Sequence, residues 1–174
     1  MNSPFILTGA SGWFGKAALL EYELLMGPKA LRTDVIAFAS TEKEIEFGSD
    51  YGPIRALPLE NIFEYPKCSG ILHLAFLTRD HIYNLGIDKY AKINRRITSV
   101  LQAYILSNPT VPIITTSSGA TKASDDRELT LEDNPYAVLK KEEEKVWHDN
   151  SIDRLSLVLR VYAASGRFMK DPRI

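Results

Sequence analysis

The segment Phe5-Ile6-Leu7-Thr8-Gly9-Ala10-Ser11-Gly12-Trp13-Phe14-Gly15 joins an apolar run to three glycines spaced three apart. A helix-forming segment, residues 16–26, follows at once. Glycines let the backbone turn tightly at the end of a strand and approach a pyrophosphate, and the free N–H groups of the next helix point at the anion. This order therefore predicts the start of a dinucleotide-binding unit.

Strands and helices alternate along the rest of the chain, which predicts a parallel sheet covered by helices. The expected strands are 4–8, 33–39, 54–57, 70–75, 111–116 and 155–161, and the expected helices are 12–26, 80–106 and a segment containing Tyr136. Right-handed crossovers would give the strand order 3-2-1-4-5-6, with the glycine loop where the sheet reverses direction. We expect an α/β, Rossmann-type doubly wound sheet that forms a single domain over residues 1–174.

A second motif, Tyr136-Ala137-Val138-Leu139-Lys140, places a phenol and an ammonium one helical turn apart on the same face. A cation beside a phenol favours the phenolate, so such a pair suits proton transfer to or from a carbinol or carbonyl oxygen. A Tyr and a Lys four residues apart are also common on an ordinary helix surface. The glycine loop in the same chain favours the catalytic interpretation.

A third motif is the β-branched run Val111-Pro112-Ile113-Ile114-Thr115-Thr116, which continues into Ser117-Ser118-Gly119-Ala120. Ligands bind at one edge of an open α/β sheet, where the strands end, so a hydroxyl there can reach a substrate oxygen. The same residues could instead form a turn whose side chains bond the local backbone. Both interpretations are compatible with a strand.

These three motifs, in this order, resemble those of the extended short-chain dehydrogenase/reductases, the NAD-dependent epimerase/dehydratase group. The likeness includes His73-Leu74-Ala75, Asn94 and the segment 157–162, and it covers essentially the whole chain. The resemblance implies that Tyr136 is the acid/base and that Lys140 binds the nicotinamide ribose and tunes Tyr136. It also implies that Ser118 orients the substrate oxygen, with Ser117 one register away as the fallback. The cofactor-binding residues implied in this way are Gly9, Ser11, Gly12, Trp13, Phe14, Gly15, Ser40, Ala75, Asn94, Tyr136 and Lys140.

The chain departs from the family pattern at three places. Thr121-Lys122-Ala123 stands where the family has Val-Tyr-Gly, and Phe76 replaces a usual small residue after Ala75. The family continues past the segment 160–162 into a smaller lobe that holds the substrate, whereas this sequence ends at Ile174. We therefore expect most of the substrate-binding lobe to be absent.

The choice between NAD and NADP depends on the end of the second strand, where an acid would accept the ribose 2′-hydroxyl. The sequence there is Ala37-Phe38-Ala39-Ser40-Thr41, without that acid. Ser40, Thr41 and Lys43 could accommodate a 2′-phosphate, which would favour NADP, but Glu42 and Glu44 stand close to them. The residues leave both cofactors open.

Composition excludes several other classes. A formal charge of −1, with Lys140-Lys141 followed at once by Glu142-Glu143-Glu144, gives no field to recruit nucleic acid or an anionic membrane. We interpret that acidic run as a solvated helix face. Cys68 is the only cysteine, the three histidines are widely spaced, and no metal site is expected. Without an apolar span or a leader segment, the expected location is the cytoplasm.

His73 should lie in its strand as a hydrogen-bonded or apolar-face residue. Trp13 and Phe14 could stack on a base, but their position at the start of a helix favours packing against the sheet.

The leading functional hypothesis is an NAD(P)-dependent oxidoreductase of the epimerase/dehydratase type that acts on a nucleotide-linked sugar. Epimerisation, dehydration and reduction are not separated by the residues present. The alternative is a dinucleotide-binding fragment or remnant that turns nothing over, and a regulatory or scaffold domain is a third possibility. The resemblance also makes a homodimer through the helices that contain Asn94 and Tyr136 plausible.

Overall fold

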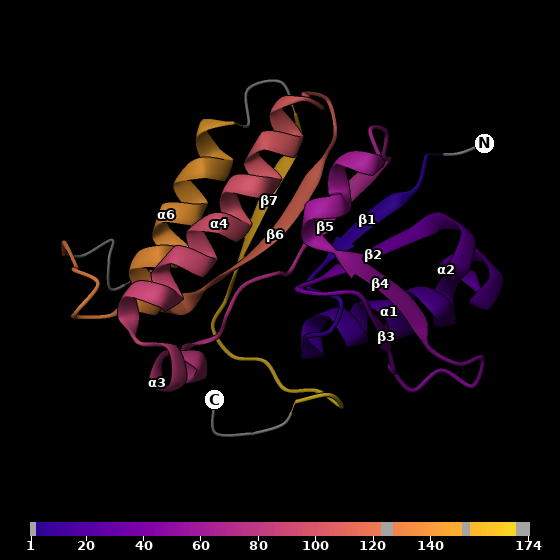
Figure 1. Ribbon diagram of the computed structural model, residues 1–174, viewed down its shortest axis with the longest axis horizontal. Helices are drawn as coiled ribbons and strands as arrows, with labels where there is room; N and C mark the ends of the chain where they lie inside the picture. The colour runs from indigo at the N-terminus through magenta and orange to yellow at the C-terminus, as the bar shows by residue number, and fades with distance from the viewer. Residues whose placement is uncertain (1–2, 123–126, 151–153, 170–174) are drawn as a thin grey trace. The chain divides into compact units, whose positions relative to one another are not determined.

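The computed structural model describes residues 3–122, 127–150 and 154–169, and Figure 1 shows the course of the chain. The strands are β1 (Phe5–Thr8), β2 (Val35–Ala39), β3 (Lys43–Ile45), β4 (Ile54–Pro58), β5 (Gly70–His73), β6 (Ile113–Ser118) and β7 (Ser156–Val161). The α-helices are α1 (Trp13–Met26), α2 (Pro28–Asp34), α3 (Ile82–Leu85), α4 (Ile87–Leu106) and α6 (Pro135–Asp149). Short 3₁₀ helices are formed by Leu59–Glu64, Arg79–His81 and Gly119–Thr121.

The sheet has the hydrogen-bonded strand order β3-β4-β2-β1-β5-β6-β7. β1 pairs in parallel with β2 and with β5, and β2 pairs in parallel with β4. When β3 is set aside and the strands are numbered along the chain, this order reads 3-2-1-4-5-6, so the predicted Rossmann-type α/β sheet is confirmed. β3 is an antiparallel edge strand, with Glu44 opposite Arg55, and it is not among the strands that the sequence pattern predicts.

Two glycines correct the predicted element boundaries. The helix expected over residues 80–106 is interrupted at Gly86, whose φ of 74° is left-handed, so α4 begins only at Ile87. Gly27, with φ of 88°, ends α1, and Pro28 then occupies the first turn of α2. The strand expected from residue 33 therefore begins at Val35.

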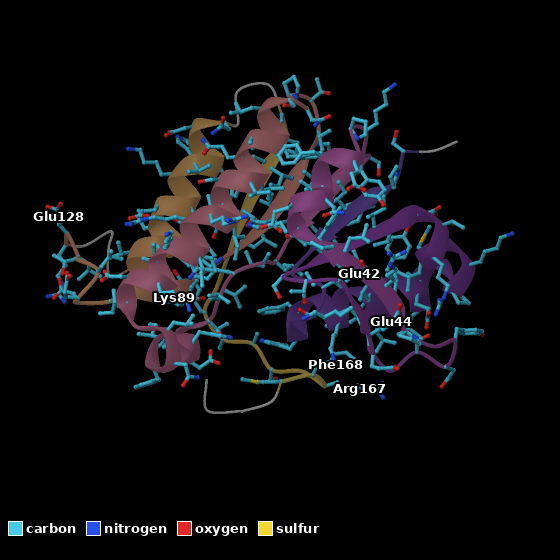
Figure 2. All side chains as sticks on the ribbon, viewed as in Figure 1. Glu42, Glu44, Lys89, Glu128, Arg167 and Phe168 are labelled. Carbon is cyan, nitrogen blue, oxygen red and sulfur yellow. The ribbon has the colours of Figure 1, made fainter. Side chains whose placement is uncertain are left out.

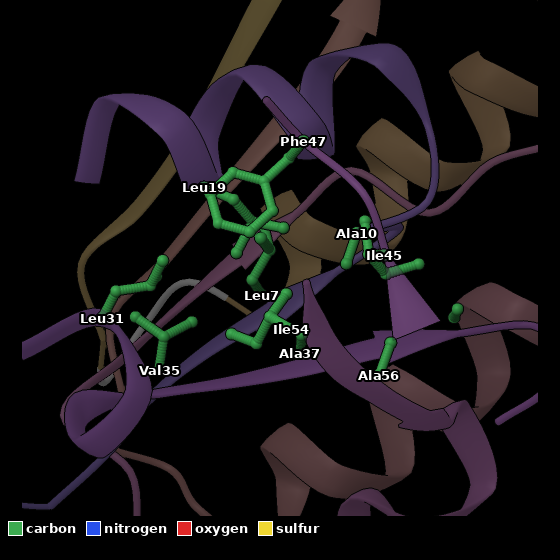
Figure 3. Close-up of a cluster of buried hydrophobic side chains, with 11 residues drawn as sticks. Leu7, Ala10, Leu19, Leu31, Val35, Ala37, Ile45, Phe47, Ile54 and Ala56 are labelled. Carbon is green, nitrogen blue, oxygen red and sulfur yellow. The ribbon is translucent and has the colours of Figure 1, made fainter. Parts of the chain in front are cut away.

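The chain divides into two compact units, each described by itself. Unit 1 consists of residues 1–75, 111–113 and 164–174, within the described ranges. Its core brings together apolar side chains from α1, α2 and β1–β4, with Phe47 fully buried among them (Figure 3). Phe168, labelled beside Arg167 in Figure 2, packs against this core from the segment that follows β7.

Unit 2 consists of residues 76–110 and 114–163. Tyr90 and Ala91 of α4 and Leu139 of α6 form its buried cluster. Half-buried apolar side chains from residues 76–85 and Leu131 pack against that cluster. α6 begins at a favourable N-cap, because the Asn134 side chain accepts a hydrogen bond from the Ala137 N–H at 3.1 Å and a proline follows it. This start fixes the positions of Tyr136 and Lys140 at the first two turns of the helix.

Candidate functional site

The glycine loop of unit 1 is a tight turn that leaves no room for side chains at two positions. Gly9 has φ of 74°, and a Cβ there would lie 2.5 Å from the carbonyl carbon of Leu74. A Cβ at Gly15 would lie 2.3 Å from the carbonyl oxygen of Gly9. A Cβ at Gly12 would approach only that oxygen, at 3.3 Å. Gly9 and Gly15 are therefore required by the packing of the turn, whereas Gly12 lies on its exposed side.

The start of α1 fits an anionic ligand. Gly12 is the N-cap residue, no side chain caps the helix, and its first turn contains no acidic residue. The backbone N–H groups of such a terminus attract anions, and a small N-cap residue lets the anion approach closely. Ser11 beside it is exposed and adds a hydroxyl. The loop therefore matches the requirements of a pyrophosphate group.

Trp13 and Phe14 lie within this loop and pack on each other. Their ring centroids are 3.9 Å apart, at an interplanar angle of 23°. A Cβ built on Gly166 would lie 3.3 Å from the Trp13 ring. These are packing contacts within unit 1, and both aromatic side chains are half-buried.

The ends of β1 and β5 meet beside the glycine loop through a buried polar contact. The Thr8 hydroxyl lies 2.6 Å from Nδ1 of His73, and both side chains are almost fully buried. His73 is thus a hydrogen-bonded strand residue, as the sequence predicts. Leu74 and Ala75 continue from this strand past Gly9, so Ala75 contributes backbone close to the turn.

The end of β2 leaves Ser40 exposed, as expected of a residue that could meet a ribose. The nearby Arg55 does not carry a free positive charge, because its guanidinium forms an ion pair with Glu42 at 2.6 Å. Glu42 and Glu44 are labelled in Figure 2. The local charges therefore do not distinguish NAD from NADP.

In unit 2, burial alternates along β6 and separates the two candidate serines. Ser117 is buried on the same face as Thr115, whereas Ser118 is half-buried on the opposite face with Thr116. The Ser118 hydroxyl accepts a hydrogen bond from the Ala120 N–H at 3.1 Å. This bond fixes the side chain and still allows the hydroxyl to donate its own hydrogen.

Tyr136 lies in an aromatic and cationic environment. The ring of Phe76 approaches it edge-on, with centroids 5.7 Å apart and planes at 87°. The guanidinium of Arg79 stands 5.7 Å from the centre of the Tyr136 ring. Tyr136 itself is half-buried and remains accessible. Phe76 and Arg79 thus contact the predicted acid/base, although no spacing in the sequence indicated either contact.

Tyr136 also affects the buried Tyr90 of α4. Burial raises the pKa of Tyr90, and the nearby Tyr136 raises it further. The Tyr90 hydroxyl donates a hydrogen bond to the Leu77 carbonyl oxygen at 2.8 Å. Tyr90 therefore stays neutral and acts structurally, by holding the segment that carries Phe76.

Lys140 is buried and held by protein groups. Its ammonium donates to the Thr116 carbonyl oxygen at 2.9 Å and to Oε2 of Glu143 at 2.8 Å. The nitrogen also lies 3.9 Å from the centre of the Phe76 ring. The side chain of Glu143 is only 2% exposed. The interpretation of residues 142–144 as a solvated face is therefore wrong at Glu143, because an i,i+3 partner on the buried face of α6 draws it inward.

Glu144, the next residue of that run, is half-buried. The guanidinium of Arg160, on β7, donates two hydrogen bonds to the Glu144 carboxylate, at 2.8 and 2.7 Å. Burial is the largest single influence and by itself would raise the pKa of Glu144. The hydrogen bonds and charge of Arg160, acting together with Ser117 and Lys141, outweigh burial and hold that pKa below its ordinary value. The pair joins α6 to β7 and fixes the helix that carries Tyr136.

We expect this pair to make stability depend on pH. Because the folded pKa of Glu144 is lowered, its stabilising contribution is present above the unfolded pKa and is lost as the pH falls through the folded pKa. Between about pH 5 and pH 3 the stability advantage of the natural chain over Glu144→Gln should therefore shrink. Urea unfolding followed by circular dichroism at several pH values measures this difference. A difference that stays constant with pH would contradict the assignment.

Asn94 of α4 is almost fully buried. Its Oδ1 accepts a hydrogen bond from the Leu77 N–H at 2.8 Å, and within the described residues its Nδ2 has no hydrogen-bond partner. Asn94 thus orders the same segment after β5 that Tyr90 holds.

A groove of about 810 Å³ also lies in unit 2, between α6, β7 and the segment before α6. Its lining includes Glu144, Arg160, His148 and Glu128, the last of which is labelled in Figure 2. Neither Tyr136 nor Ser118 lines it. The groove is therefore separate from the candidate catalytic residues.

Among the described residues, no group of acidic, histidine and cysteine side chains could hold a metal ion. Within the same ranges, every helix is too short or too polar to cross a membrane. Cys68 is a buried free thiol.

Comparison with known proteins gives matches in structure alone. No protein-family model matches the chain, and no curated protein matches it in sequence. Among solved structures, it is similar to MoeE5 in complex with UDP-glucose and NAD, with a TM-score of 0.65 and 20% identity over 90% of this chain and 53% of that one. It is similar to UDP-glucose 4-epimerase from Thermotoga maritima, with a TM-score of 0.63 and 19% identity over 92% and 55%.

A third similar structure is a GalE-like L-threonine dehydrogenase from Cupriavidus necator, with a TM-score of 0.66 and 13% identity over 90% of this chain and 54% of that one. The chain spans about half the length of these proteins. The glycine turn, the strand order and these matches lead to one conclusion: the chain has the fold of epimerase, dehydratase and dehydrogenase enzymes of the short-chain dehydrogenase/reductase type.

Proposed function

We propose that this chain binds NAD or NADP as part of an oxidoreductase of the epimerase/dehydratase type. The observation that carries the proposal is the turn at Gly9 and Gly15, which has no room for a Cβ and leads into the uncapped N-terminus of α1. A turn of this shape lets a pyrophosphate approach the backbone closely and meet the N–H groups of the helix. In this proposal Gly12, Ser11 and the backbone of residues 13–15 contact the phosphates, and Ser40 and Ala75 contact the adenosine half.

Tyr136 and Ser118 would act directly on the reacting oxygen of the substrate. When bound, the nicotinamide would exchange a hydride with the substrate carbon. Tyr136 would take the proton from the substrate hydroxyl onto its phenolate oxygen as that hydroxyl becomes a carbonyl, and return it in the reverse direction. Ser118 would donate a hydrogen bond to the same substrate oxygen and orient it. We propose a nucleotide-linked sugar as the substrate class, because two of the similar structures are bound to UDP-glucose.

Dinucleotide binding can be tested by calorimetric titration with NAD and, separately, with NADP. A Gly12→Val variant should keep its fold, because Gly12 has φ of −72° and an added Cβ meets a single close atom at 3.3 Å. Its side chain would cover the surface where the phosphates approach, so we expect at least about a 100-fold loss of affinity. Circular dichroism provides the control for folding.

Saturable binding of one dinucleotide that is lost in Gly12→Val supports the proposal and identifies the cofactor. Equal affinity of the natural chain and the variant would show that the nucleotide binds elsewhere. Failure of both dinucleotides to bind the folded natural chain would remove the oxidoreductase proposal for this chain.

A second candidate function is dinucleotide binding without turnover. The environment of Lys140 favours it, because the ammonium is already held by Glu143 and by the Thr116 carbonyl. The assay is turnover of UDP-glucose or UDP-galactose, followed by the absorbance of the reduced nicotinamide and by product analysis. Any turnover that depends on Tyr136 eliminates this second candidate.

A further inference from the structure

The ammonium group of Lys140 is enclosed by other groups of unit 2. Two oxygen acceptors, on Thr116 and Glu143, lie within 2.9 Å of its nitrogen, and the face of the Phe76 ring covers it at 3.9 Å. An ammonium group has three hydrogens, and here a carbonyl, a carboxylate and an aromatic face surround them. The side chains of Lys140 and Glu143 are 6% and 2% exposed, so water does not compete for these contacts.

Phe76 contacts both members of the Tyr-Lys pair. Its face lies over the Lys140 nitrogen, and its ring meets the Tyr136 ring edge-on. Tyr136 and Lys140 are one turn apart on α6, so a single aromatic side chain covers that stretch of the helix. The ring therefore covers the Lys140 nitrogen while Tyr136, which it meets only edge-on, stays half-buried.

The buried ion pair keeps this arrangement closed. Separation of a buried Lys from its Glu leaves two desolvated charges without partners, which is strongly unfavourable. A cation under an aromatic ring gains additional attraction where water is excluded. A ribose hydroxyl would have to displace one of these contacts before it could bind the ammonium.

We propose that Phe76 and Glu143 hold Lys140 away from the nicotinamide ribose, and that these two residues set the affinity of the chain for the nicotinamide half of a dinucleotide. The inference rests on the proposed dinucleotide binding. It assigns a specificity-determining role to Phe76 and a positioning role to Glu143. The natural chain should then bind ADP, which lacks the nicotinamide ribose, about as tightly as it binds the complete dinucleotide.

The first test compares calorimetric titrations of ADP, NAD and NADP for the natural chain and for Phe76→Ala. The variant opens the space over Lys140, so we expect the better-bound dinucleotide to gain about tenfold in affinity, with ADP unchanged within about twofold. Phe76→Leu keeps the apolar volume but loses the aromatic face, and should gain about threefold. It serves as the second variant if the alanine substitution disturbs folding. Leu77→Ala, in the same segment, removes similar bulk without removing an aromatic ring and should leave the ratio of affinities unchanged.

The second test measures Lys140 directly, without nucleotide. Acetic anhydride labelling followed by mass spectrometry reports how fast each lysine is acetylated. We expect Lys140 to react at least about tenfold faster in Phe76→Ala than in the natural chain, because the ring no longer covers the nitrogen. Lys89 of α4 is exposed and serves as the internal reference, with equal rates in both proteins. Figure 2 labels it.

Glu143→Gln keeps an oxygen acceptor beside Lys140 but removes the negative charge. We expect it to increase dinucleotide affinity relative to ADP in the same direction as Phe76→Ala. If Glu143 only stabilised the fold, Glu143→Gln would lower the affinities for ADP and for the dinucleotide by the same factor.

The outcomes separate the two proposals. If ADP binds but the ratio of dinucleotide to ADP affinity is the same in every variant, the role of Phe76 and Glu143 is wrong and nucleotide binding stands. An unchanged rate of Lys140 acetylation in Phe76→Ala also overturns the inference. If neither ADP nor a dinucleotide binds any folded variant, the inference and the proposed function fail together.

Discussion

Gly9→Ala should lower the free energy of unfolding by about 3 kcal/mol or more. Alanine at φ of 74° is strained, and its Cβ would lie 2.5 Å from the carbonyl carbon of Leu74 and 2.6 Å from the nitrogen of Ala75. Neither atom can move alone, because the Leu74 N–H donates a backbone hydrogen bond to the Thr8 carbonyl oxygen at 3.1 Å. The strain therefore spreads into the ends of β1 and β5. Urea unfolding followed by circular dichroism measures the loss.

Gly52→Ala is the matched control for that measurement. Gly52 also has a left-handed φ, of 86°, but a Cβ there meets nothing within 4 Å. The Gly52→Ala substitution should lower the free energy of unfolding by only about 1 kcal/mol, which is the cost of placing alanine at a left-handed φ. The difference between the two variants isolates the close approach of the Gly9 turn to β5. Equal losses in both variants would show that the turn relaxes without difficulty and is not required by its packing.

Tyr136→Phe should reduce turnover of UDP-glucose by about 10²- to 10⁴-fold, because it removes the proposed proton donor and acceptor. The change preserves the ring, so the edge-on contact with Phe76 and the position under Arg79 remain. Dinucleotide affinity should therefore stay within about twofold of the natural value. Initial rates and calorimetric titration of the same preparation measure the two quantities.

Tyr90→Phe is the control for the loss of a buried hydroxyl in the same unit. It removes the hydrogen bond to the Leu77 carbonyl oxygen and should lower stability by about 1 kcal/mol. Turnover should remain close to that of the natural chain. Full turnover in Tyr136→Phe would contradict the acid/base assignment, whatever the effect at Tyr90.

Much of the fold follows from local signals in the sequence. The apolar run before Gly9, the glycine spacing and the alternation of strands and helices predict the strand order that the structure contains. The errors occur where one residue changes the local geometry. Gly86 interrupts the helix expected over residues 80–106, and Pro28 begins a short helix that extends into the start of the strand expected over residues 33–39. β3 is too short for a recognisable alternation, so its pairing with β4 appears only in three dimensions.

The candidate site divides in the same way. The places of Ser118, Tyr136 and Lys140 in the secondary structure could be predicted from motifs, because the end of a strand and the turns of a helix fix them locally. The partners of Lys140 could not be predicted in this way, since Thr116 and Phe76 are separated from it by long stretches of sequence. Glu143 is only three residues away, but a charged run gives no indication of which member turns inward until the buried face of α6 is known.

The sequence by itself determined the α/β fold, the glycine turn and the Tyr-Lys spacing, because each depends on backbone preferences and on periodicity within a few residues. Tertiary structure alone decided what surrounds those groups. It placed Phe76 against both Tyr136 and Lys140 and drew Glu143 into the interior. The physical reason is burial: a buried ammonium must find partners, and which groups serve depends on side chains that the folded chain brings together from distant positions.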